Sequence, residues 1–91
     1  MRQLEVTSIF DKVAQAWMQP MFCQSLAQAQ RSFSDVVNDS SSDFYKHPED
    51  FALYWIGKWN NDNGELSGMV PELIVSADSL WIPPLDRDWE T

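Results

Sequence analysis

The first half of the chain alternates apolar and polar positions in a way that predicts two strands. A first strand is expected over Leu4–Asp11, where side chains alternate between two faces and β-branched residues are frequent. A second extended segment is expected over Trp17–Phe22. Because Pro20 has no N–H for a ladder hydrogen bond, this segment is expected at a sheet edge or a bulge.

The clearest helical pattern spans Ser25–Asn38. Ser25, followed three residues later by Gln28, forms a capping-box pattern. Apolar residues then recur at helical spacing and form one stripe, made of Leu26, Ala29, Phe33, Val36 and Val37. Asn38 and the polar segment after it are expected to end the helix, so this stretch predicts one amphipathic helix.

The second half predicts three more strands. Ala52–Trp59 is apolar at most positions and is expected to be a central strand. The turn residues of Asn60–Gly64 predict a hairpin, with a short return strand over Glu65–Met69. Pro71–Trp81 is expected to form a further strand. Residues 83–91 are expected to be a proline-broken acidic tail outside the domain.

Together these elements predict a small α+β domain over residues 1–82. The expected order is β-β-α-β-β-β, with one amphipathic helix packed on a mostly antiparallel sheet of about four to five strands. A length of 91 residues fits a single domain, and the many aromatic residues supply large groups for burial. Composition leaves open whether the chain forms a homo-oligomer.

The charge of the chain disfavours tight binding to nucleic acid. The formal net charge is -8, from 6 Lys and Arg against 14 Asp and Glu. The basic residues are scattered singly, at Arg2, Lys12, Arg31, Lys46, Lys58 and Arg87. Non-specific DNA binders cluster such residues to neutralise several phosphates. An acidic surface instead favours a basic protein partner and disfavours an anionic membrane surface, so no membrane partner is expected.

The residue types needed for catalysis or metal binding are scarce. The single histidine, His47, precedes Pro48, Glu49 and Asp50, which together are typical of a loop that enters a helical turn. A zinc site needs three or four suitable ligands. The sequence contains one histidine and one cysteine, Cys23, which are too few. We therefore expect no enzyme activity, no metal and no cofactor. A single cysteine also fits a reducing compartment, and no signal peptide is recognised.

The tryptophans of the central strand are candidates for binding single-stranded nucleic acid. In a regular strand, Leu53, Trp55, Gly57 and Trp59 share one face, while Lys58 points to the other. Two indoles separated by a glycine could stack bases of single-stranded nucleic acid, but such platforms come with a positive groove. From the residues alone, a core or a protein interface is favoured over base stacking.

Three segments in order resemble the small nonstructural protein of gokushovirus-type microviruses, which are single-stranded DNA phages. The most specific is "SSDFYKHPEDFALYWIGKWNNDNGEL", with its Lys-His-Pro-Glu-Asp-aromatic motif. "SIFDKVAQAWMQPMF" is similar to the family's opening, and "AQAQRSFSDVVND" to the end of its helix. The resemblance covers residues 8–66.

The resemblance implies a phage protein of the host cytoplasm, described as DNA-binding or as a regulator of single-stranded DNA synthesis and packaging. It supplies no catalytic residues. Given the net charge, action through a viral or host replication or packaging protein is expected, with Tyr54, Trp55 and Trp59 as partner-binding candidates. One alternative is a single-stranded DNA binder that uses Trp55, Trp59, Lys58, Lys46 and Arg31. Another is an acidic mimic that inhibits a host DNA-binding protein.

Overall fold

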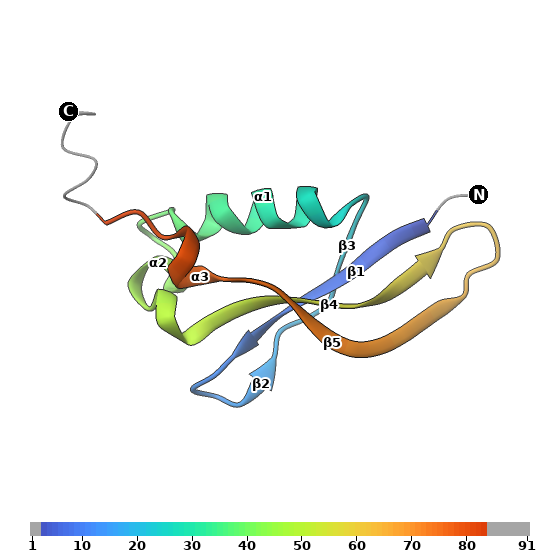
Figure 1. Cartoon of the computed structure of the whole chain (residues 1–91), viewed down its shortest axis with the longest axis horizontal. Coiled ribbons are helices and arrows are strands. Elements are labelled where there is room, and N and C mark those ends of the chain that lie inside the picture. The colour runs from blue at the N-terminus through green and yellow to red at the C-terminus, as the bar shows by residue number, and fades with distance from the viewer. Residues whose placement is uncertain (1–2, 84–91) are drawn as a thin grey trace.

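A computed structural model describes residues 3–83, in which one layer of helices covers one side of a sheet (Figure 1). The strands are β1 (Gln3–Asp11), β2 (Ala16–Trp17), β3 (Met21–Cys23), β4 (Phe51–Asn60) and β5 (Leu66–Ser76). The helical elements are α1 (Leu26–Val37), the single turns α2 (Asp43–Lys46) and α3 (Ala77–Leu80), and the 3-10 turn η1 (Pro48–Asp50).

The sheet is antiparallel throughout the described residues. Its strand order is β2-β1-β4-β5, and β3 pairs with β1 beside β2. β4 is therefore central, and the β4–β5 hairpin extends past the N-terminal end of α1 (Figure 1). The predicted α+β class, with one long helix on an antiparallel sheet, is confirmed.

The strongest sequence patterns are the ones that the structure reproduces. The first strand, the central strand and the helix all form close to their predicted bounds. Ser25 is the N-cap of α1, and its hydroxyl accepts a hydrogen bond from the Gln28 N–H at 3.1 Å. The Gln28 side chain reaches back to accept one from the Gln24 N–H at 2.9 Å. Pro48 begins the expected helical turn before β4.

Two predictions of strand boundaries are wrong. The segment Trp17–Phe22 is not one strand, because Pro20 separates β2 from β3, and both are short edge strands. The return strand and the strand expected from Pro71 are one continuous strand, β5, which ends where the turn α3 begins. Pro71 is tolerated because β5 lies at the sheet edge, where one side of its backbone needs no ladder partner.

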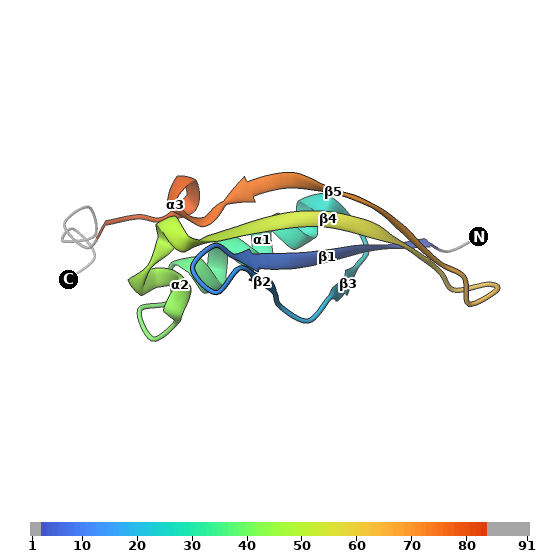
Figure 2. The same cartoon turned by 90° about the horizontal axis from the view of Figure 1, so that it is seen from below.

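The core lies between α1 and one side of the sheet. It is built from buried side chains of β1, α1, β4 and α3, chiefly Ile9, Phe33, Val37, Leu53 and Ala77. Figure 2 looks at the opposite side of the sheet, with α1 behind β1 and β4. We call the side under α1 the helix side, and the opposite side the open face.

The remaining expectations concern the ends of the chain and membranes. Beyond Pro83, the predicted acidic tail lies outside the described residues. Within residues 3–83, the helices are too short or too polar to cross a membrane.

Candidate functional site

A bulge in β4 determines where the tryptophans point. Thr7 of β1 lies opposite Trp55, but the next residue back, Val6, lies opposite Gly57, so Ile56 is an extra residue in β4. A bulge of this kind shifts the alternation of side chains by one position. The prediction that Trp55 and Trp59 share one face is therefore wrong, because their partners, Thr7 and Leu4, point to opposite sides of the sheet.

Trp55 lies on the helix side, together with Thr7. Its indole N–H donates a hydrogen bond to the Gly57 carbonyl at 2.9 Å, which fixes the ring against its own strand. The Lys58 ammonium lies 5.6 Å from the centre of the Trp55 ring. The bulge brings these two side chains to one side, whereas the sequence predicted opposite sides. Such a cation–π contact engages the charge of Lys58 and covers one face of the indole.

Trp59 lies on the open face, in a cluster with a residue far away in sequence. Its ring is 6.0 Å from that of Phe22, which pairs with Val6 on the same face. The Trp59 indole N–H donates to the Asn61 side chain at 2.7 Å, so the ring is oriented by the hairpin turn.

A second aromatic cluster occupies the other end of the open face. Trp17 of β2 lies 4.8 Å from Phe10 and 5.0 Å from Tyr54, measured between ring centres. Phe10 pairs with Trp17 across the ladder, and Leu73 of β5 pairs with Tyr54. Trp17 and Leu73 are 45% and 56% exposed, so this cluster is accessible rather than covered.

The open face carries no charged side chain at its paired positions within the described strands. The register places all four charged residues of β1, β4 and β5 on the helix side, namely Glu5, Asp11, Lys58 and Glu72. At these positions the open face therefore presents aromatic, aliphatic and small side chains and no phosphate-binding group. Its composition is that of the apolar centre of a protein interface.

The other basic candidates do not gather around either tryptophan. Lys46 ends α2, which packs beside α1 in the helix layer, and its side chain is exposed. Arg31 is exposed on α1 in a shallow depression shared with Ala27, Asp35 and Leu80. The three basic candidates thus come from three elements. The register places Lys58 on the helix side, and the other two belong to helices.

Three open-face aromatics were missing from the sequence-based candidates: Phe10, Trp17 and Phe22. Each belongs to a strand that pairs with β1 or to β1 itself. Alternation along β1 could have indicated Phe10. Trp17 and Phe22 lie in two short strands on either side of Pro20. The sequence of these strands does not indicate which side of the sheet each side chain takes.

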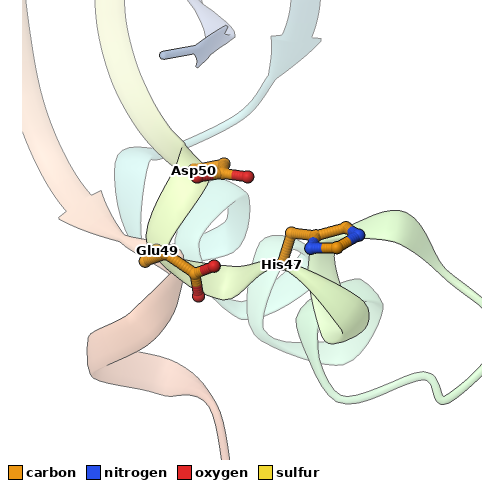
Figure 3. A group of neighbouring side chains, drawn as sticks. All are labelled: His47, Glu49 and Asp50. Carbon is orange, nitrogen blue, oxygen red and sulfur yellow. The ribbon is translucent and has the colours of Figure 1, made fainter. Parts of the chain in front are cut away.

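The side chains of the His47-Pro-Glu-Asp motif do converge locally (Figure 3). One ligand atom each of His47, Glu49 and Asp50 lies within 4.8 Å of the others. His47 and Glu49 are exposed and Asp50 is half-buried, while Pro48 is buried. Backbone bonds hold the turn, because the Asp50 N–H donates to His47 O at 3.0 Å and the Lys12 N–H donates to Asp50 O at 2.8 Å. The three side chains could offer ligands to a cation, but exposed acidic groups alone do not define a metal site.

Cys23 lies on the helix side of β3, near the N-terminus of α1. Burial raises the pKa of the Cys23 thiol, the neighbouring Thr7 hydroxyl opposes this change, and the Glu5 carboxylate adds to it. The thiol donates a hydrogen bond to Glu5 O at 3.4 Å. A raised pKa disfavours the reactive thiolate, which makes Cys23 a poor nucleophile.

Comparison with known proteins places most of the chain in one family. The family model described as Phage ORF5 protein matches residues 4–80, which includes α1, the α3 turn and all of the sheet except Gln3. Neither the curated proteins nor the solved structures contain a significant match.

Proposed function

Because the chain belongs to the phage ORF5 protein family, we propose that it is a non-enzymatic phage protein that acts by contacting a protein partner. The partner is a viral or host protein of single-stranded DNA synthesis or packaging, met in the host cytoplasm. The contact is made by the open face of the sheet, with Tyr54 and Trp59 as central residues.

The observation that carries this proposal is the uncharged aromatic surface of the open face. Two ring clusters, one around Tyr54 and one around Trp59, are joined by the strands that hold them. Exposed patches of this kind mark binding sites, and tryptophan and tyrosine are enriched among the few residues that dominate the affinity at protein interfaces. The acidic remainder of the chain would steer a basic partner towards this face.

Direct DNA binding has less support from the geometry. Phosphate contacts provide most of the affinity for nucleic acid, and Lys58, the nearest basic residue in sequence to both tryptophans, lies on the helix side over Trp55. The two indoles cannot act as one stacking platform, because the bulge at Ile56 turns them to opposite sides of the sheet.

A fluorescence titration with oligo-dT tests this preference. At about 50 mM salt, where even weak phosphate contacts strengthen, we expect no quenching of tryptophan emission. Trp55→Ala and Trp59→Ala provide a matched pair on opposite sides of β4. Salt-sensitive quenching that disappears in folded Trp59→Ala, but persists in Trp55→Ala, would show that the open face binds DNA and would refute the proposal.

A further inference from the structure

A groove lies on the helix side of the sheet, between α1 and the edge formed by β1 and β3. It encloses about 430 Å³, with Thr7 and Ile9 at its floor and Ala29 and Phe33 on the α1 wall. This volume is within the usual range of binding pockets, and none of the lining residues is charged. The groove therefore has a mostly apolar interior. Phe22, which also packs against Trp59, is a lining residue that the groove shares with the open face.

The mouth of the groove is unusually apolar for an exposed surface. Met18, Met21, Phe22 and Val36 line it, and they are 45%, 42%, 50% and 41% exposed. Methionine side chains are flexible and adapt to partners of different shape. A molecule held only in the cavity would leave this rim in water, whereas a peptide laid along the groove would cover it.

Two buried polar atoms on the same side of β1 have no hydrogen-bond partner in the part of the chain that the structure describes. The Thr7 hydroxyl is fully buried, and it lies beside the Cys23 thiol without a well-aligned hydrogen bond. Two residues earlier, Glu5 Oε1 is buried and also without a partner. Leaving such groups unsatisfied costs free energy, so a hydrogen bond from a bound molecule would be favourable. Because both atoms are buried, that donor must displace the side chains that cover them.

The carboxylate of Glu5 indicates the charge of that donor. Lys58 stands opposite Glu5 in the ladder, but its ammonium lies over the Trp55 ring instead. A cation delivered by a partner would therefore meet a carboxylate that has no ion pair within residues 3–83. The net charge of -8 adds a long-range attraction for the same kind of partner.

We propose that this groove binds a basic peptide segment of a protein partner. An apolar side chain of the segment fills the cavity over Thr7, and a neighbouring Lys or Arg side chain reaches Glu5. The inference rests on the proposed function only in taking the partner to be a protein, and it assigns that partner a second contact on the helix side of the sheet.

The test uses a short amphipathic peptide of leucine and lysine as the probe. It is titrated into the full-length, ¹⁵N-labelled protein, alongside a version with glutamate in place of lysine and one with serine in place of leucine. We expect amide shifts at Thr7, Cys23, Ala29 and Val36 with the leucine–lysine peptide alone. Equal binding of the glutamate or serine peptide, or shifts confined elsewhere, would overturn the inference.

Matched variants separate the groove from general charge attraction. Glu5→Gln should weaken binding of the leucine–lysine peptide about fivefold or more, because the ion pair is lost. Glu72→Gln removes the same charge from an exposed position on the same side of the sheet and should leave the affinity unchanged. Equal losses in both variants would overturn the inference.

A variant at the rim covers the case in which Glu5→Gln does not fold. Val36→Ser at the exposed rim should weaken binding by a similar factor through lost apolar contact. Unchanged affinity in Val36→Ser would contradict the groove. The proposed function is tested separately, at Tyr54 and Trp59 on the open face. It fails if these residues make no contact with a protein partner.

Discussion

Trp55 and Trp59 lie on opposite sides of the sheet, although an even number of positions separates them in β4. The extra residue Ile56 produces this arrangement, since Thr7 pairs with Trp55 and the adjacent Val6 pairs with Gly57. One tryptophan is thereby held at the helix side under Lys58, and the other joins Phe22 on the open face. The bulge thus places on two surfaces the two tryptophans that the sequence predicts on one.

A glycine is required at Gly57, the residue that follows the bulge. A Cβ placed there would collide with the carbonyl oxygen of Ser67 on β5, which is backbone and cannot move without disturbing the ladder. We expect Gly57→Ala to lower the free energy of unfolding by about 1–3 kcal/mol, as overpacking does. Urea denaturation measures the change.

The cross-strand partner of Gly57 provides the control. A Cβ at Gly68 would have no atom within 4 Å, so Gly68→Ala should leave the stability close to that of the wild type. Equal effects of the two substitutions would contradict the close approach of β4 and β5 at Gly57.

Removal of two neighbouring hydroxyl groups of β1 should change the stability of the fold in opposite directions. The Ser8 hydroxyl donates to Met18 O at 2.7 Å, whereas the buried Thr7 hydroxyl has no such partner among the described residues. Thr7→Val should therefore stabilise the fold by about 1 kcal/mol, and Ser8→Ala should destabilise it by about the same amount. Thermal and urea unfolding of both variants measure the difference, and a shared sign would refute the assigned hydrogen bonds.

The Cys23 thiol should titrate at higher pH in the folded chain than in the unfolded chain. Burial raises its pKa, so the stability gained from keeping the thiol neutral is full below the unfolded pKa. That contribution is lost as the pH rises through the folded pKa. Alkylation rates measured against pH, with and without urea, give both midpoints. A folded midpoint at or below the unfolded one would contradict this reading.

Sequence patterns predicted the parts of the fold that local chemistry determines. Ser25 and Gln28 begin α1 through their own hydrogen bonds, and Pro48 begins its turn through its fixed backbone angle. The bulge at Ile56 could not be predicted in this way. Both faces of β4 are largely apolar, so alternation gives no sign of an extra residue, and the register depends on β1 and β5.

The candidate site was predictable only in part for the same reason. Tyr54 and Trp59 were identified because they stand in a conspicuous aromatic strand. Trp17 and Phe22 reach the open face through pairing with β1, which brings together residues distant in sequence. The cavity over Thr7 depends on the packing of α1 against β1 and β3, and no sequence motif predicts it.

Site-specific photo-cross-linking in infected cells tests the central claim, contact with a protein through the open face, most directly. A photoreactive amino acid replaces Leu73, which is 56% exposed opposite Tyr54, and in a matched chain it replaces exposed Ala27 on α1. We predict that the Leu73 position cross-links to a phage or host protein of DNA synthesis or packaging, and that Ala27 does not. Cross-linking of the Leu73 position to DNA, or equal protein capture from both positions, would contradict the account.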